Sequence, residues 1–367
     1  MKFRFLFLLL CSFAVAGCGA VRLNIGQPAK STLPGSGVFK TPDRGDSWFQ
    51  KGDLYVLSGP SKKLSFTNVT FLKFDPQDPN TLYMGTDNGM YYSFSRGEGW
   101  SQTLQGRGVV NDVAITPDNK CTLYAAVFNR VYKTVDCTRN WDLVHFSSLP
   151  QQFYTSILVS YADSNTIYLG TSDGAIISSK NGGVSWEVLK FVDSPVTRLL
   201  GHGAYPNSLY LVTPKFGIQK SDDGGLTWAS LNALPVHDAK GDLMLRNEKT
   251  PVTLTELQGA NTYYDLKFDT SVKEGLIYAS AYGIFRLIAG AYWQEINTLS
   301  KPLQTTIHAV DIDTIDGKSI FFATTGALYR SENGGKEWTI KSLPSVGIPR
   351  FLAVSYTHLT LPTTPYV

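Results

Sequence analysis

Two short stretches carry residue types that could do chemistry. Residues 170–174, Gly-Thr-Ser-Asp-Gly, match the G-x-S-x-G pattern that places a serine nucleophile on a strand-to-helix turn. Residues 311–317 hold three aspartates and a glycine, the residue types of a calcium loop, but the third acid and the glycine each come one position late for an EF-hand. The first stretch joins two short strand-like segments, so we expect a hairpin there rather than a nucleophile. At the second stretch we expect a solvated turn.

Metal, cofactor and nucleic-acid binding find no support in the sequence. His145, His202, His237 and His308 are scattered, and no two of them have metal-ligand spacing. The formal net charge is +3, from 33 basic and 30 acidic residues, which gives no basic surface of the kind that nucleic acids require. We therefore predict no metal, no cofactor and no nucleic-acid partner.

The first residues read as an export signal. Lys2 and Arg4 precede an apolar run, residues 5–15, which is too short to span a bilayer. The run ends Val15-Ala16-Gly17-Cys18, which resembles the bacterial lipobox. That resemblance implies that residues 1–17 are removed as a lipoprotein signal peptide and that acyl chains on Cys18 hold the protein on a membrane. An ordinary secretory signal is the alternative.

Residues 18–37, the lipidated Cys18 and the small and polar residues after it, read as a flexible tether with an average reach of about 25 Å. The predicted location is the cell envelope, outside the cytoplasm. Disulfides persist in such compartments. Cys121 and Cys137 are the cysteines that remain after Cys18, and we expect both in turns at the same end of one structural unit. We predict a Cys121–Cys137 disulfide, with two free thiols as the alternative.

A repeat organises the rest of the chain. Each of the seven Trp residues ends an octet of the pattern S/T-x-D/N-x-G-x-x-W, and successive Trp residues lie 41 to 65 positions apart. The clean copies are residues 41–48, 179–186, 221–228 and 331–338. Three copies depart from the pattern, and we call them worn copies. Ser95 replaces the acidic residue in one, Thr138 replaces the glycine in another, and Arg286 and Ile288 disrupt the third.

The octet has the chemistry of a tight turn between strands. The Asp or Asn side chain can accept backbone N–H groups within the turn, and the Ser or Thr hydroxyl can do the same. Glycine supplies a positive φ, and Trp begins the next strand and covers apolar surface. The pattern resembles the Asp-box, or bacterial neuraminidase repeat. The resemblance implies structural roles for these residues: Asp43, Trp48, Trp100, Asp136, Trp141, Asn181, Trp186, Asp223, Trp228, Trp293, Asn333 and Trp338.

The flanks of the octets predict the fold. Two short alternating strands precede each octet, and another strand and turn lie upstream, which gives four strands per unit. We predict an all-β protein, a β-propeller over residues 38–353. Residues 37–41 supply only half a unit and residues 348–353 look like the first strand of another, so a seven-bladed ring with a truncated last blade is expected. A longer array is the alternative.

The last residues fit no unit of the repeat. Residues 354–364 resemble a translated transposon-end sequencing adapter. We treat residues 354–367 as an artefact of that kind and expect the natural sequence to differ after Ala353. A genuine tail rich in threonine and proline is the alternative.

The resemblance also bears on function. The chain is similar to sortilin-type receptor domains, photosystem II assembly factors, xyloglucanases and sialidases. Sialidases carry an Arg-Ile-Pro motif before the first Asp-box and an arginine triad. Here residues 348–350 read Ile-Pro-Arg, in another order, and they follow the last Asp-box. We expect a non-catalytic module that binds or assembles a protein, peptide or glycan. The alternative is a glycoside hydrolase, xyloglucanase-like or, less well matched, sialidase-like, with two carboxylates flanking a sugar.

Loops on one face are the predicted ligand site. Two connections, residues 49–70 and 230–263, are longer than the others, and they share a face with the hairpins between second and third strands. Loops on a rigid scaffold commonly carry function. The candidate residues on this face are Asp87, Asn88, Asp173, Lys215, Tyr282, His237, Asp238 and Asp242.

Overall fold

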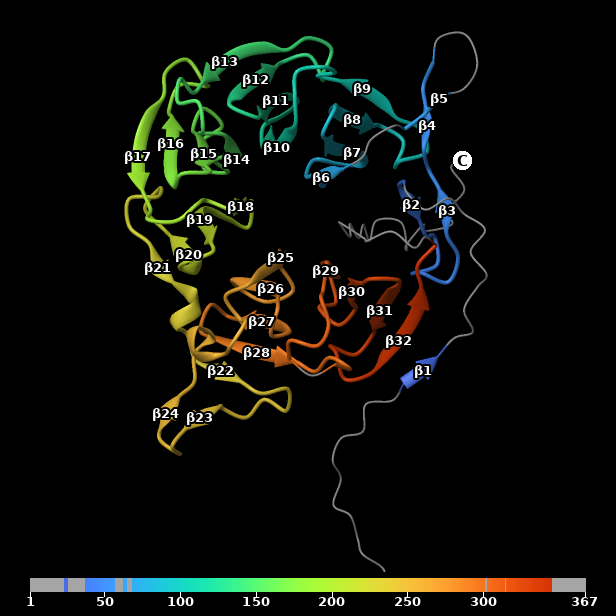
Figure 1. Ribbon diagram of the computed structural model, residues 1–367, viewed down its shortest axis with the longest axis vertical. Helices are drawn as coiled ribbons and strands as arrows, with labels where there is room; N and C mark the ends of the chain where they lie inside the picture. The colour runs from blue at the N-terminus through green and yellow to red at the C-terminus, as the bar shows by residue number, and fades with distance from the viewer. Residues whose placement is uncertain are drawn as a thin grey trace, which may run out of the picture.

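Six antiparallel sheets stand around a ring (Figure 1). The structure, a computed structural model, describes residues 23–25, 37–56, 62–64, 68–300, 302–313 and 315–344. The only helices in these residues are the short 3-10 turns η1 (Leu231–Ala233) and η2 (Leu254–Glu256). No helix in this part of the chain has the length and apolar character to cross a membrane.

Each sheet has four consecutive strands, and we number the sheets as blades 1 to 6. Blade 1 contains β6 (Val69–Asp75), β7 (Asp78–Thr86), β8 (Gly89–Ser93) and β9 (Ser101–Thr103). Blade 2 contains β10 (Val110–Thr116), β11 (Asn119–Val127), β12 (Arg130–Thr134) and β13 (Asp142–Phe146). Blade 3 contains β14 (Tyr154–Val159), β15 (Ile167–Thr171), β16 (Ala175–Ser179) and β17 (Glu187–Phe191). Blade 4 contains β18 (Arg198–His202), β19 (Tyr205–Thr213), β20 (Gly217–Ser221) and β21 (Ala229–Ser230). Blade 5 contains β25 (Tyr263–Asp269), β26 (Gly275–Ser280), β27 (Ile284–Ile288) and β28 (Tyr292–Ile296). Blade 6 contains β29 (Ala309–Ile312), β30 (Ile320–Thr324), β31 (Ala327–Ser331) and β32 (Trp338–Ser342).

The core lies between neighbouring blades. The second strand of a blade is covered on both faces, and β15 is buried at every position. One core cluster joins Tyr124 and Val131 of blade 2 to Ile157 and Leu169 of blade 3. Each large apolar side chain buried in this way contributes about 1.5–3 kcal/mol. Burial on both faces explains the nearly continuous apolar character of these strands.

A bulge recurs in the innermost strand. The pairing register shifts after the first residue of β6, β10, β14 and β25. In three blades the extra residue donates a side-chain hydrogen bond to a backbone carbonyl of the next blade: Thr70 to Val110, Asn111 to Tyr154 and Thr155 to Val196. Bulges re-aim side chains in this way, and here they link the inner strands into a ring.

The octets form the turns between third and fourth strands. In the 221–228 copy, the N–H of Gly225 donates to Ser221 Oγ at 2.9 Å and the N–H of Thr227 donates to Asp223 Oδ1 at 2.9 Å. The same two bonds occur in the 41–48, 134–141, 179–186 and 331–338 copies. In the worn copy at residues 134–141, hydrogen bonds from Asn140 hold the pKa of Asp136 at about 2.

In blade 5 the worn octet is replaced by a longer-range link. Arg286 Nε donates to Asp269 Oδ2 at 2.6 Å, and Arg286 Nη2 donates to Ser271 Oγ at 2.8 Å. Asp269 is completely buried and is the last residue of the first strand of the blade, β25. The ion pair therefore connects the turn after β25 to β27, where the worn octet begins. In other blades the octet makes the connection to the turn after the first strand with its own backbone.

The prediction of seven blades was wrong: the described residues form six. Between blades 6 and 1 lies a two-stranded hairpin, β2 (Phe39–Lys40) and β3 (Phe49–Gln50). Trp48 packs against Phe321 and Leu328 of blade 6, and Val38 packs against the cluster of blade 1. Two strands cannot make a four-stranded blade, and residues 348–353, which were expected to begin its first half, lie outside the described residues.

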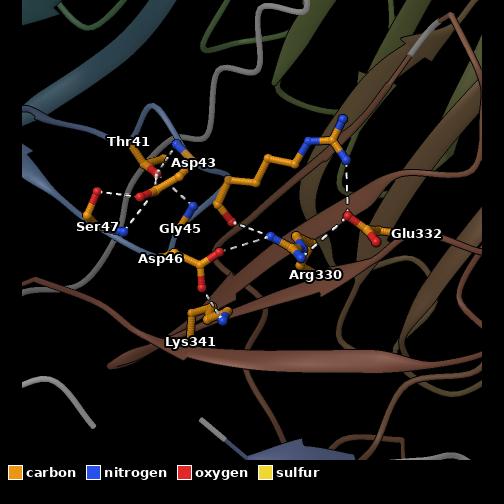
Figure 2. A network of polar contacts seen from close by, with 9 residues as sticks. Thr41, Asp43, Gly45, Asp46, Ser47, Arg330, Glu332 and Lys341 are labelled. Atoms are coloured by element: carbon orange, nitrogen blue, oxygen red, sulfur yellow. Dashed lines mark hydrogen bonds and ion pairs between the residues drawn. The ribbon is translucent and has the colours of Figure 1, made fainter. Parts of the chain in front are cut away.

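Polar contacts fix this hairpin to blade 6 (Figure 2). Asp46 pairs with Lys341 and with Arg330, the latter at 3.5 Å. Arg44 and Arg330 both reach Glu332, at 3.0 and 3.4 Å. Exposed ion pairs contribute little one by one, but this set is a network that spans nearly the whole length of the chain in sequence.

Three blades carry an additional parallel strand on their outer edge. β1 (Leu23–Ile25) runs beside β32, and β22 (Val236–His237) runs beside β28. Leu54 of the short strand β4 (Asp53–Leu54), which itself pairs with β5 (Lys62–Lys63), bridges to Trp100 in the same orientation. In each case the partner residue is the octet Trp, and these three Trp residues, 100, 293 and 338, are at most 1% exposed.

The predicted disulfide joins Cys121 to Cys137 across 16 residues. Cys121 lies in β11 and Cys137 lies in the worn octet, where its N–H also donates to the Cys121 carbonyl at 3.1 Å. Cys137 and Thr138 both have a positive φ, a conformation that glycine adopts without strain. The crosslink holds the turn at the position where the glycine is missing.

Removing this crosslink should lower stability measurably. We expect the double variant Cys121→Ser/Cys137→Ser to lose about 3 kcal/mol of unfolding free energy, because a loop of this length is no longer closed in the unfolded chain. Urea denaturation of the variant, and of the reduced wild type as a matched control, measures the loss. Unchanged urea midpoints in both would contradict a stabilising role.

Candidate functional site

The turns divide the ring into two faces. On one face, which we call the octet face, octet turns contact the first-to-second turns, as in the bond from Gly182 N to Asn165 O at 2.9 Å. On the other, the loop-rich face, the second-to-third hairpins contact the connections between blades, as in Phe128 N to Val109 O at 3.0 Å. The candidate residues Asp87, Asn88, Asp173, Lys215 and Tyr282 lie in second-to-third hairpins and belong to the loop-rich face, whereas His237, Asp238 and Asp242 lie on the insertion beside the outer strand β28.

The predicted hairpin residues do not converge. Asp87 and Asn88 lie between β7 and β8, Asp173 between β15 and β16, and Lys215 between β19 and β20, so each comes from a different blade. Asp173 is held by local bonds: both of its carboxylate oxygens accept from Gln152 Nε2 at 3.0 Å. Lys215 pairs with the exposed carboxylate of Asp193. These residues stabilise individual turns around the ring.

The same geometry settles the two motifs considered first. Residues 170–174 form the hairpin between β15 and β16, not a strand-to-helix turn, so Ser172 is not on a nucleophile elbow. Among the described residues no group of three or more His, Cys, Asp and Glu side chains is placed to hold a metal ion. Asp316, near the end of the acidic stretch, accepts N–H bonds from Lys318 and Ser319 at 2.7 and 3.0 Å.

The long insertion gathers one set of candidates at the rim of blade 5. His237 ends β22 and packs its ring 4.2 Å from that of Tyr292. Asp238 follows it, and its Oδ1 accepts the N–H groups of Lys240 and Asp242, both at 2.9 Å. The turn therefore has a fixed shape and sits against β28. Of the predicted residues, His237, Asp238 and Asp242 are brought together here.

Glu295 of β28 is a member of this rim that the sequence analysis missed. Burial raises the pKa of its carboxyl, and the negative charge of Asp238 raises that pKa further. Glu295 also influences Tyr282 of the adjacent hairpin. Burial is the main cause that raises the pKa of the Tyr282 hydroxyl, and the charge of Glu295 adds to it. No local signal marked Glu295, because it lies in an ordinary strand and meets Asp238 only through the pairing of β22 with β28.

The inner strands place charged residues around the centre of the ring. We use the term ring positions for the residues that follow the bulge or its equivalent, Asp112, Ser156, Arg198 and Asp265 among them. Asp112 Oδ2 accepts the N–H of Ile157 at 3.1 Å, Ser156 Oγ accepts that of Leu199 at 3.0 Å, and Asp265 Oδ2 accepts that of Val310 at 3.2 Å. Asp112, Ser156 and Asp265 therefore each contact the next blade.

Two lysines sit two residues beyond ring positions, on strands β6 and β25. Lys73 forms an ion pair with the buried Asp112 and donates to the carbonyl of Val113 at 2.9 Å. Burial lowers the pKa of Lys73, Asp112 opposes that effect, and the charges of Arg198 and Lys267 add to the lowering. Three cations thus lie close enough to repel one another at the centre of the ring.

Comparison with known proteins identifies the fold. The structure of YCF48 bound to D1 peptide is similar, with a TM-score of 0.53 and 14% identity over 79% of this chain and 86% of that chain. The chain is a β-propeller. YCF48 from Cyanidioschyzon merolae matches with a TM-score of 0.53 and 15% identity, covering 76% of this propeller and 86% of that chain.

An enzyme shares the architecture. The Niastella koreensis GH74 enzyme matches with a TM-score of 0.54 and 18% identity, over 80% of this chain and 47% of that chain. No protein-family model and no curated protein matches the propeller sequence. Identities this low show the fold alone, so the choice between a binding module and an enzyme depends on the residues of the candidate site.

Proposed function

We propose that this protein is a membrane-anchored envelope lipoprotein whose β-propeller binds a protein or peptide through the insertion at the outer edge of blade 5. The observation that carries the proposal is the insertion in blade 5. It is an ordered structure, and its hairpin β23 (Leu245–Arg246) and β24 (Thr250–Pro251) projects outward from the ring (Figure 1). Leu243 and Leu245 expose 41% and 46% of their surface there. Exposed apolar side chains beside a rigid polar rim are typical of a protein-binding surface.

The likeness to YCF48 supports the same proposal, because that propeller was solved with a peptide bound. The lipid anchor rests on the residues around Cys18, which lie outside the described part of the structure. Radiolabelled palmitate should enter the full chain when it is expressed in bacteria, and Cys18→Ala should abolish the labelling. Signal-peptide cleavage without label would leave an exported protein with no anchor and contradict this part of the proposal.

Panning a displayed peptide library tests the binding role. Enriched peptides should bind the wild type and lose most of their affinity for the double variant Leu243→Ser/Leu245→Ser, in which the exposed apolar pair is removed. The control Leu226→Ser changes a still more exposed leucine in an octet turn, 61% exposed, and should bind like the wild type. Equal loss of binding in both variants would contradict a specific surface on the insertion.

A second candidate function is glycan cleavage, favoured by one observation. Glu295 has a raised pKa and a second carboxylate, Asp238, in its electrostatic neighbourhood, which is the arrangement of an acid with a charged partner in a glycosidase. Release of reducing sugar from xyloglucan that disappears in Glu295→Gln would support this function. Binding of oligosaccharide or peptide without turnover by the wild type would exclude it for that substrate.

A further inference from the structure

Arg198 stands at a ring position where three other blades place a hydrogen-bond acceptor. Arg198 pairs with Val212 as Ser156 pairs with Gly170, so both occupy the same place in their blades. At this place Asp112, Ser156 and Asp265 accept an N–H from the next blade. A guanidinium carries only donors and cannot accept a hydrogen bond. Arg198 therefore does not serve the contact between blades 4 and 5 that its position serves elsewhere.

Arg198 lies beside Tyr263, and the Tyr263 side chain and the charges of Asp112 and Asp265 favour its charged form, but its hydrogen bonds are not all made. Its Nε is buried and has no hydrogen-bond partner, and no carboxylate of the described residues lies within 4.0 Å of its guanidinium. Tyr263, on the adjacent strand β25, has a buried hydroxyl without a partner as well. Buried polar groups are normally satisfied, and an enclosed cation normally has a counterion. Two unsatisfied groups side by side therefore indicate a missing acceptor.

The nearby carboxylates are already engaged. Asp112 accepts from Lys73, Ser156 and two backbone N–H groups. Asp265 accepts the N–H groups of Leu266 and Val310. Asp311, one blade further, accepts the N–H of Ile312. Among the described residues these carboxylates are held toward other donors, which leaves room for an acceptor for Arg198 Nε and Tyr263 Oη from outside the chain.

Arg198 and Tyr263 stand at the loop-rich end of the inner strands, beside two partly accessible lysines. Arg198 and Tyr263 are the first residues of β18 and β25, directly after the connections between blades. The side chains of Lys73 and Lys267 keep 28% and 26% of their surface accessible. An incoming group can therefore reach the same level of the ring as these cations.

We propose that Arg198 and Tyr263, with Lys73 and Lys267 beside them, bind a carboxylate of a peptide partner that enters the ring from the loop-rich face. Arginine presents parallel N–H donors that match the two oxygens of a carboxylate, and the tyrosine hydroxyl supplies one more donor. The lysines add attraction without needing direct contact. This proposal deepens the proposed peptide-binding function and rests on it.

Titration of the full chain with short peptides, followed by NMR or calorimetry, tests the site. The probes are acetyl-Gly-Gly-Glu-Gly-Gly-amide, the same peptide with Gln for Glu, and acetyl-Gly-Gly-Gly with a free carboxyl end. The Glu probe and the free-end probe should bind, and the Gln peptide should bind at least tenfold more weakly. Their relative affinities decide whether a side-chain or a terminal carboxylate is preferred. Equal binding of the Glu and Gln peptides would overturn the proposal.

Variants locate the site. Arg198→Met should weaken binding of the Glu peptide at least tenfold, and Tyr263→Phe, which removes only the hydroxyl, should weaken it about threefold. Arg139→Met, the matched control in an exposed octet turn, should bind like the wild type. Without peptide, Arg198→Met should change the melting temperature little, because burial disfavours the guanidinium while Tyr263, Asp112 and Asp265 favour its charge. A large fall in its melting temperature with unchanged peptide affinity in Tyr263→Phe would show a purely structural role.

The outcome is separable from that of the proposed function. Library peptides that bind through Leu243 and Leu245 but respond neither to Arg198→Met nor to Tyr263→Phe would exclude the ring site and leave the binding role in place. If carboxylate peptides bind at the ring while no library peptide depends on the insertion, the ring site stands and the binding role of the insertion is excluded.

Discussion

Replacing Asp112 by alanine is expected to cost about 3–5 kcal/mol of unfolding free energy, the scale for breaking a buried ion pair by removing one partner. Asp112 is 3% exposed and joins three blades. It pairs with Lys73 of blade 1, and it accepts from Ser156 Oγ at 2.9 Å and Ile157 N at 3.1 Å of blade 3. The variant leaves the lysine and these donors without their acceptor.

Urea or thermal unfolding of Asp112→Ala measures this loss, with Asp142→Ala as the control. Asp142 is an exposed aspartate on β13 of the same blade, and its replacement should change stability by less than about 0.5 kcal/mol. Asp112→Asn keeps an acceptor oxygen and should recover part of the loss. Equal stability of Asp112→Ala and Asp142→Ala would mean that the ring of contacts between blades does not hold the inner strands.

The second large effect concerns the octet Trp residues, which should divide into two groups. Trp293→Ala is expected to cost about 3–5 kcal/mol, the range for removing a fully buried large aromatic side chain. Trp293 is 0% exposed, pairs with Val236 of the additional strand β22, and donates from its indole to the Leu231 carbonyl at 2.8 Å. Its loss leaves a cavity and removes a link to the insertion.

Trp186→Ala should cost only about 1–2 kcal/mol, since only part of the side chain is buried. Trp186 lies on a blade without an additional strand and donates to Gly183 O of its own octet at 3.0 Å. It stacks 4.9 Å from the ring of His145 at a partly open edge. Chemical denaturation of the two variants side by side measures the difference. Equal losses would show that the outer strands do not decide how much each Trp contributes.

The two groups also differ at the backbone of the outer strand. Among the described residues, the register between third and fourth strands shifts in blades 2 and 3, which carry no additional strand. It runs without a shift in blades 5 and 6, which carry one, and in blade 4, whose fourth strand has only two residues. A bulge disrupts the row of hydrogen-bonding groups on an open edge and so discourages pairing with another chain. The octet turn does not decide this difference, because the 179–186 copy in blade 3 and the 331–338 copy in blade 6 make the same two turn bonds.

The sequence by itself determined the local units of this protein. The octet 221–228 makes its turn with hydrogen bonds between Ser221, Asp223 and residues no more than four positions away. The eight residues of the octet therefore determine the geometry of the turn by themselves. The hairpins before each octet, the all-β class and the Cys121–Cys137 disulfide follow from such units in the same way. Local hydrogen bonds and alternation are visible in sequence because the residues that make them are neighbours.

Only the tertiary structure decided how the units meet. The hairpin residues Asp87, Asp173 and Lys215 were expected on one face and do lie there, but the ring spreads them over separate blades. Glu295 meets Asp238, and Arg198 meets Tyr263, across 57 and 65 positions of chain. Those contacts depend on strand register, on bulges that re-aim side chains by one residue, and on an insertion that pairs with an outer edge. A shift of one residue in any of them exchanges the two faces of a strand, so the residues that meet at a site are fixed by packing and not by spacing.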